Sequence, residues 1–273
     1  MKTSNRFLTA MVVMLMLFNA AIISAQEAKT AKYYTVTSMK FNMDNNDSNE
    51  SWEAVEKEYL DKVTMKNEYV MNAGFYTHLY TENSNDLVYV QVYGSWEDID
   101  KAGPRNFELE KEAWPDEAAR AAFLKKQGAF YTAKHSDEIY TILPGTKNLE
   151  AVPTEDWILY VQTSHYAYPE NAPDGELGKL RTEYIENVIN KNEFIKGYYP
   201  HGHFWGHNST EFIEAYFVNS MEDLLKMNGR NNELFNAHWA DEDTRKDFNQ
   251  KMNKYFTGVH GDEIYTAIAS LRK

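Results

Sequence analysis

Histidine alternates with tyrosine and tryptophan along two short segments, residues 74–80 and 197–205. In a β-strand, side chains two positions apart lie on the same face, so each segment would present these residues together. Such a face offers stacking surface and hydrogen-bonding groups, which is typical of a ligand pocket wall. We expect it to line a cavity for a small molecule, with His78 or His201 as the acid–base residue. The other candidate ligand contacts on these faces are Tyr76, Tyr80, Tyr199 and Trp205.

The motif His-x-Asp-Glu-x-Tyr occurs twice, at residues 135–140 and 260–265. On a strand its histidine and aspartate share a face, and a carboxylate beside an imidazole orients the ring and raises its basicity. That arrangement suits a general base. The alternative is that the motif forms only the turn into a strand that both copies need. The candidates are His135 and His260 for catalysis, and Tyr140 and Tyr265 for ligand contact.

Six of the eight histidines lie in the second half of the chain, and three of them occur in the run HGHFWGH, residues 201–207. His201 and His203 would project from one strand face, and with His165 they could bind zinc, copper or iron. A haem is a related alternative. No three-ligand signature is visible, so the cofactor is left unassigned.

Arginine–asparagine pairs recur at Arg105 and Arg230, near glycines, where they could bind an anionic group or serve surface hydrogen bonding. Other signatures are absent. The sequence has no G-x-S-x-G, P-loop or Rossmann fingerprint and no cysteine, which disfavours acyl-transfer hydrolases, nucleotide enzymes and thiol enzymes.

The amino-terminal residues predict export. Lys2 and Arg6 precede an apolar run over residues 7–23, and Ala25 is suited to signal-peptidase cleavage, so residues 1–25 are expected to be a signal peptide. A membrane anchor is the alternative. The mature protein would be periplasmic or extracellular, free of disulfides, and without a membrane span. Its net charge of −13 before cleavage disfavours nucleic acid as a partner.

An internal repeat sets the positions of these motifs. Residues 95–143 align without a gap with residues 220–268, and 21 of the 49 positions are identical. Upstream, GFYTH at residues 74–78 resembles GYYPH at residues 197–201, which requires a two-residue shift in the alignment.

Each half has the pattern strand, helix, strand, strand, helix, strand. The expected opening strands are residues 33–41 and 157–166. Gly74 and Gly197 are expected to end the first helix of each half in the left-handed conformation. Ser95 and Ser220 are expected to cap the second helix. This order predicts an α+β fold with two ferredoxin-like units, residues 26–143 and 157–273, and a linker at residues 144–156.

Two such units on one chain resemble the dimeric α+β barrel superfamily, which includes antibiotic-biosynthesis-monooxygenase-like and NIPSNAP-like proteins. The resemblance extends from about residue 32 to the end of the chain. It implies an intrachain barrel with a small-molecule pocket beside each sheet, and a cofactor-independent oxygenase or isomerase as one form of activity. A metal- or haem-binding protein and a non-catalytic interaction module are the alternatives. The oligomeric state is expected to be a monomer or a homo-oligomer.

Overall fold

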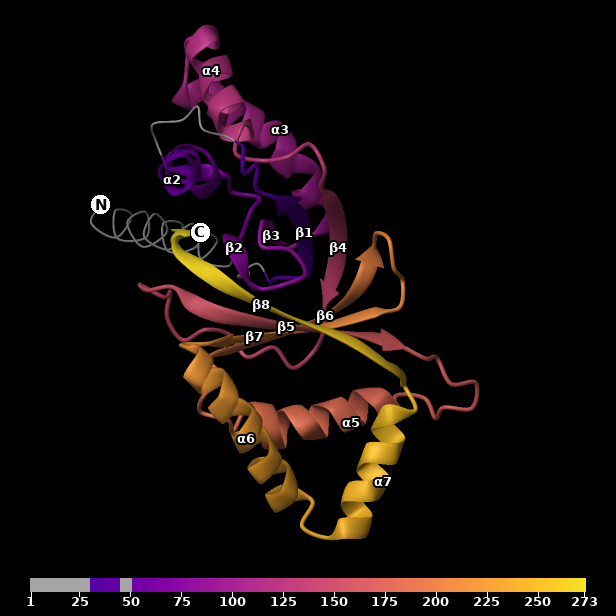
Figure 1. Ribbon diagram of the computed structural model, residues 1–273. Coiled ribbons are helices and arrows are strands. Elements are labelled where there is room, and N and C mark those ends of the chain that lie inside the picture. Colours follow the sequence, from indigo (N-terminus) through magenta and orange to yellow (C-terminus); the bar gives the residue numbers. More distant parts are fainter. Residues whose placement is uncertain (1–29, 45–50) are drawn as a thin grey trace, which may run out of the picture. The chain divides into compact units, whose positions relative to one another are not determined.

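The computed structural model describes residues 30–44 and 51–273 (Figure 1). The predicted signal peptide lies outside the described residues. Ala31–Lys273 form one compact unit. Within the described part of the chain, no helix is long and apolar enough to cross a membrane.

The predicted helices and strands are present in the predicted order. In the first half they are β1 (Tyr33–Lys40), α2 (Trp52–Lys62), β2 (Asn72–Tyr80), β3 (Asp86–Tyr93), α3 (Trp96–Ala113), α4 (Glu117–Gly128) and β4 (Ser136–Ile142). In the second half they are β5 (Trp157–Tyr166), α5 (Glu176–Tyr184), β6 (Gly197–Trp205), β7 (Glu211–Val218), α6 (Met221–His238), α7 (Glu242–Asn253) and β8 (Phe256–Arg272). A π-helical turn, Ile185–Ile189, continues α5.

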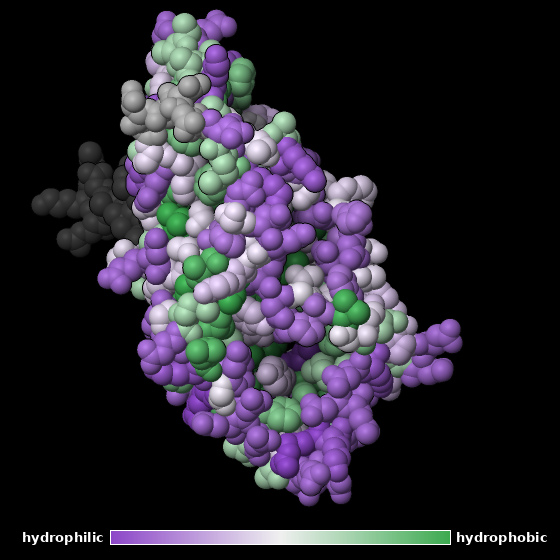
Figure 2. Space-filling model, in the orientation of Figure 1, coloured by the Kyte–Doolittle hydropathy of each residue, from purple (hydrophilic) through white to green (hydrophobic). Residues whose placement is uncertain are grey.

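The strands form a closed antiparallel barrel in the order β1-β3-β2-β8-β5-β7-β6-β4. The six helices of the described residues lie outside it, with α2–α4 beside the strands of the first half and α5–α7 beside those of the second (Figure 1). Figure 2 shows that α6 and α7 expose mainly hydrophilic residues. The two halves join where β2 pairs with β8 and β4 pairs with β6. Each half therefore supplies strands that complete the other.

Serine caps begin the second helix of each half, as the sequence predicts. The Ser95 hydroxyl accepts a hydrogen bond from the Asp98 amide at 3.1 Å, and the Ser220 hydroxyl accepts one from the Asp223 amide at 3.2 Å. These bonds satisfy amide groups that the first turn of a helix leaves without partners.

The strand register corrects the alignment of the two halves. Gly74 pairs with Val90, whereas Tyr199 pairs with Ala215, which lies 125 positions after Val90. The two-residue shift suggested by GFYTH and GYYPH is therefore wrong in three dimensions, and a constant spacing of 125 holds through these strands. By this spacing Tyr76 corresponds to His201, and His78 to His203. A shift of two residues preserves the face of a strand, which is why the sequence pattern concealed it.

The expectation for Gly74 and Gly197 is also wrong. Both lie inside strands, in β2 and β6, and neither has a positive φ. A Cβ atom at Gly197 would lie 2.9 Å from the ring of Tyr199, and one at Gly74 would lie 3.2 Å from the Tyr76 hydroxyl. The tyrosine two residues later leans back over each glycine, so the repeated Gly-x-Tyr is a close-packing unit.

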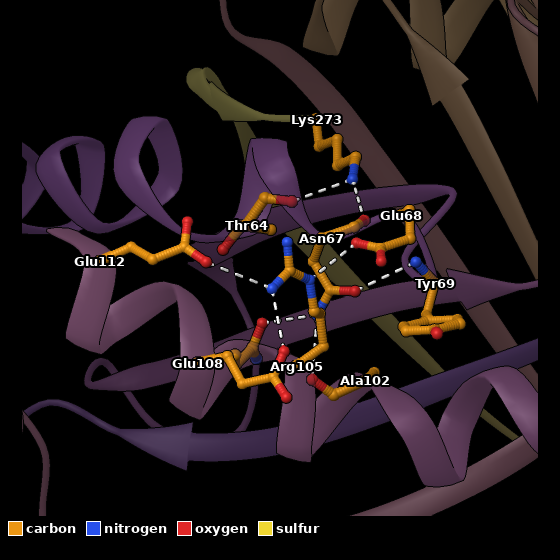
Figure 3. Close-up of polar contacts among 10 residues, drawn as sticks. Thr64, Asn67, Glu68, Tyr69, Ala102, Arg105, Glu108, Glu112 and Lys273 are labelled. Carbon is orange, nitrogen blue, oxygen red and sulfur yellow. Dashed lines mark hydrogen bonds and ion pairs between the residues drawn. The ribbon is translucent and has the colours of Figure 1, made fainter.

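Buried asparagines connect the segment after α2 to α3 in the first half, and the segment after α5 to α6 in the second half. Asn67 Nδ2 donates to the Ala102 carbonyl at 2.9 Å and to Asn106 Oδ1 at 2.6 Å, and Asn67 Oδ1 accepts from the Tyr69 amide at 3.0 Å (Figure 3). Asn192 makes the same three bonds to the corresponding groups of the second half, at 3.0, 2.8 and 3.0 Å. Both side chains are fully buried and out of reach of water, so these bonds satisfy polar groups that would otherwise have no partner.

Candidate functional site

The aromatic and histidine faces predicted from the sequence lie inside the barrel. Tyr76, Tyr140, Tyr265 and His201 are each no more than 7% exposed. The three tyrosines pack in two clusters with aliphatic residues from strands of both halves, and His201 contacts the ring of Tyr140. These side chains therefore fill the barrel core. Tyr199 belongs to the same packing, and its hydroxyl accepts a hydrogen bond from the Leu149 amide at 3.1 Å.

His201 is a neutral core histidine in this arrangement. Its ring lies edge-on to Tyr34 and Tyr140, with centroid separations of 5.2 and 5.1 Å. Its Nδ1 lies 3.0 Å from the Tyr199 carbonyl oxygen. Burial lowers the pKa of His201 from 6.5 to about 4, against the smaller opposing effect of that carbonyl. At neutral pH the ring is therefore uncharged and is not the imidazolium ion that acts as a histidine general acid.

The remaining predicted residues lie nearer the surface. Tyr80 and Trp205 are 63% and 70% exposed. The two His-x-Asp pairs form as the strand periodicity predicts. His135 Nε2 lies 3.3 Å from an oxygen of Asp137, and His260 Nδ1 lies 3.0 Å from an oxygen of Asp262. All four side chains are exposed, and the pairs lie outside the barrel core.

Arg105 and Arg230 are already bound to carboxylates. Arg105 forms ion pairs with Glu68 and Glu108, both at 3.0 Å (Figure 3). Arg230 forms the corresponding pairs with Glu193 and Glu233 at 3.1 and 3.0 Å. An external anion would have to displace these partners. The repeated Arg–Asn sequence is explained by these interactions: the arginine pairs with two glutamates, and the asparagine bonds to the buried Asn67 or Asn192.

The three predicted metal ligands do not form a three-ligand metal site in the described part of the chain. His201 and His203 lie on β6, while His165 lies on β5 and its Nδ1 is 3.1 Å from Thr210 Oγ1. Among residues 30–44 and 51–273, no group of three or more histidine, aspartate or glutamate side chains has a geometry suited to a metal ion.

Arg181, on α5 in the second half, was not predicted as a site residue from the sequence. Its guanidinium carbon lies 4.5 Å from the centre of the Phe212 ring on β7. Its Nη2 atom is buried and has no hydrogen-bond partner. Close by, the Tyr198 hydroxyl donates a hydrogen bond to Glu214. Burial and then the Glu214 carboxylate raise the pKa of Tyr198, while Arg181 opposes them.

A pocket of about 490 Å³ lies along α5 beside Arg181. Gly178 and Thr182 leave room on the helix face, and Pro144 from the segment between the halves contributes to the lining. Lys179 also lines the pocket and forms no ion pair with any described residue. The sequence contains one sign of this site. Arg181 lies next to the apolar positions 177, 180, 184 and 188, which predict a buried helix face, and a charge on such a face needs a partner.

The corresponding position of the first half holds the opposite charge. Glu56, 125 residues before Arg181, is 3% exposed. It accepts hydrogen bonds from the Tyr131 hydroxyl and from Gln127 Nε2, the latter at 2.9 Å. Burial raises the pKa of Glu56, and these two bonds partly offset it. Both carboxylate oxygens of Glu56 therefore have hydrogen-bond partners, whereas the Nη2 atom of Arg181 has none.

No family model matches the sequence, and no curated protein is similar to it. Several solved structures are similar in fold. A proposed monooxygenase from Fusobacterium nucleatum has 11% identity and a TM-score of 0.53, with 88% of this chain and 94% of that chain covered. A chlorite dismutase from Candidatus Nitrospira defluvii has 13% identity and a TM-score of 0.52, with 86% and 90% covered. A proposed chlorite dismutase has 11% identity and a TM-score of 0.51, with 89% and 97% covered. The chain therefore has the α+β barrel fold of monooxygenase-like and chlorite-dismutase-like proteins.

Proposed function

We propose that the protein is an exported, oxygenase-like α+β barrel that binds a small aromatic or apolar molecule carrying one acidic group. The ligand would lie in the pocket along α5 with its acidic group at Arg181. The fold is shared with proteins described as monooxygenases, which supports an oxygenase-like activity as the class to test. Export rests on the signal peptide predicted at residues 1–25, and places the protein in the periplasm or outside the cell.

The observation that carries this proposal is the unpartnered Nη2 atom of Arg181. A buried charged donor without an acceptor is destabilising by more than a neutral one, so an acceptor from a ligand would be favourable there. A guanidinium matches a carboxylate in planar, bidentate geometry. The Phe212 ring packs against the guanidinium at 4.5 Å, and Tyr166 packs on Phe256 and Phe212, with centroids 5.5 Å away in both cases. These rings hold the guanidinium but do not line the pocket, so the apolar body of the ligand would lie along Gly178, Thr182 and Pro144.

We also propose that the barrel arose by duplication of one ferredoxin-like unit, with residues 26–143 and 157–273 as the copies and residues 144–156 as the linker. The constant spacing of 125 residues in the strand register supports this history. The halves have since diverged, because Glu56 and Arg181 occupy corresponding positions. We therefore expect one ligand per chain, bound by the second half, whether the protein is a monomer or a homo-oligomer.

Replacement of Arg181 by methionine is expected to weaken binding of benzoate by about 10- to 100-fold, as loss of a charge-assisted hydrogen-bond pair implies. Benzamide, which has the same ring without the charge, should bind weakly to both proteins. Calorimetric titration of residues 26–273 measures this. Arg230→Met removes an arginine that is already paired with carboxylates, and should bind benzoate as the original protein does. Equal benzoate affinity in the Arg181→Met protein would contradict the proposal.

Oxygen consumption distinguishes an enzyme from a binding protein. Aromatic carboxylates with electron-rich rings, such as dihydroxybenzoates, should be consumed with uptake of dioxygen by the original protein and not by Arg181→Met. Ligand binding without oxygen uptake would indicate the non-catalytic alternative. A Soret band or stoichiometric metal in protein purified without chelator would instead support the metal- or haem-binding alternative.

A further inference from the structure

Two corresponding clusters of polar residues lie at the ends of strands in the two halves. The Asp86 cluster comprises Lys40, His78, Thr81, Asp86 and Tyr265, and the Glu211 cluster comprises His165, His203, Gly206, Glu211 and Tyr140, 125 positions away in each case. The strand register places them in the same way. Lys40 pairs with Asp86 as His165 pairs with Glu211, and Tyr265 pairs with His78 as Tyr140 pairs with His203.

In the Asp86 cluster, both carboxylate oxygens of Asp86 have partners from the same half of the chain. Lys40 Nζ lies 2.5 Å from one carboxylate oxygen of Asp86. The other oxygen accepts hydrogen bonds from Thr81 Oγ1 at 2.9 Å and from the Asn83 amide at 2.8 Å. Thr81 also contacts His78, whose Nδ1 lies 2.8 Å from its hydroxyl. Burial acts to raise the pKa of Asp86, but the bonds from Lys40, Asn83 and Thr81 outweigh it and lower the pKa.

The Glu211 cluster lacks the groups that complete the first one. His165 replaces Lys40, and its Nδ1 contacts Thr210 at 3.1 Å instead of the carboxylate. Gly206 replaces Thr81, and the Nε2 atom of His203 is buried with no partner. The Tyr140 hydroxyl donates to Glu211 at 2.8 Å. None of the ion pairs of the described residues includes Glu211.

A second carboxylate lies beside this cluster. Glu138, on β4, accepts a hydrogen bond from the His207 amide at 2.9 Å and likewise forms no ion pair with a described residue. Glu138 lies two residues before Tyr140 on β4 and therefore on the same face of the strand. Burial, then Glu211, and finally Glu138 raise the pKa of Tyr140. The strand register thus brings two carboxylates, a tyrosine hydroxyl and an imidazole with an unpartnered nitrogen to neighbouring strand ends, and no lysine or arginine of the described residues forms an ion pair with either carboxylate.

We propose that the Glu211 cluster binds the ammonium group of a small primary amine, which takes the place that Lys40 fills in the Asp86 cluster. An ammonium group has three donors in a compact head. Glu211 and Glu138 provide anionic acceptors, and His203 Nε2 accepts when the proton of the ring is on Nδ1. Glu211 and His165 are half-buried, so the position is open to a ligand. This site is independent of the α5 pocket, since Glu211 and Phe212 face opposite sides of β7.

The test gives the Glu211 cluster the lysine of the Asp86 cluster. His165→Lys supplies the Glu211 cluster with the lysine that the Asp86 cluster already contains. We expect the original protein to bind n-butylammonium chloride, with a shift of the His203 ring resonances, and His165→Lys to show neither effect. Glu211→Gln should weaken binding at least tenfold. His135→Lys adds the same charge at an exposed histidine elsewhere, and should bind the amine as the original protein does.

Three results would overturn the proposal. The first is that n-butylammonium and the uncharged n-butanol have the same effect on the original protein. The second is unchanged amine binding in either His165→Lys or Glu211→Gln, so one folded variant is enough to decide the test. The third is binding of Zn²⁺ at this cluster without any binding of the amine, which would identify a metal site.

Discussion

Acidification from pH 6.5 to pH 4 is expected to lower the free energy of unfolding by up to about 3 kcal/mol through His201 alone. Burial between Tyr34 and Tyr140 lowers the pKa of His201 from 6.5 to about 4 in the folded protein. Between these values the unfolded chain binds a proton that the folded chain excludes, so stability decreases as pH falls. The contribution is fully present above pH 6.5. Urea denaturation at several pH values measures it.

His201→Gln isolates this effect from the carboxylates that titrate in the same range. Glutamine keeps a donor for the Tyr199 carbonyl but stays neutral, so the variant should lose clearly less stability than the original protein between pH 6.5 and pH 4. His135→Gln is the matched control, because the side chain of His135 is 54% exposed. It should follow the original protein. The same pH dependence in His201→Gln and the original protein would show that His201 does not control this window.

Asn192→Ala is expected to lower the free energy of unfolding by about 3 kcal/mol. The side chain is fully buried and bonds to the Met227 carbonyl and the Phe194 amide, at 3.0 Å in both cases. Its removal leaves both backbone groups without partners where water does not reach, at about 1–3 kcal/mol each. Asn67→Ala should cost a similar amount in the first half. Denaturation by urea, followed by tryptophan fluorescence, provides the measurement.

The matched control for these substitutions is Asn249→Ala. Asn249 is exposed on α7, and its replacement should change stability by no more than about 0.5 kcal/mol. The two halves are joined by the strand pairs β2–β8 and β4–β6, so each buried-asparagine variant should unfold in one transition. Two separate transitions, or a loss below about 1 kcal/mol in both variants, would mean that the asparagines do not fasten one cooperative barrel.

The order of helices and strands and the position of the helix caps could be predicted from the sequence. These features depend on contacts within a few residues, such as the Ser95 hydroxyl with the Asp98 amide, so periodicity and residue type were sufficient. The barrel was predicted from the resemblance of two such units on one chain to the dimeric α+β barrel superfamily. The same periodicity correctly placed each histidine of the His-x-Asp pairs beside its aspartate.

How exposed these residues are depends on packing between distant strands. Tyr76 and His201 were expected in a pocket wall, but Tyr76 packs against Phe217 and His201 packs between Tyr34 and Tyr140 in the barrel core. The register also depended on distant partners, since a shift of two residues leaves the pattern of faces unchanged.

The charged residues of the two candidate ligand sites, Arg181, Glu211 and Glu138, were not predicted from the sequence, although Tyr140, His165 and His203 of the Glu211 cluster were candidates. Arg181 stands out because no neighbour bonds to its Nη2 atom. The Glu211 cluster becomes visible only beside the Asp86 cluster, where Lys40 supplies the missing ammonium. A residue type reports which bonds a side chain can form. Whether those bonds are already satisfied depends on groups brought together from distant parts of the chain, and that is settled only by the folded barrel.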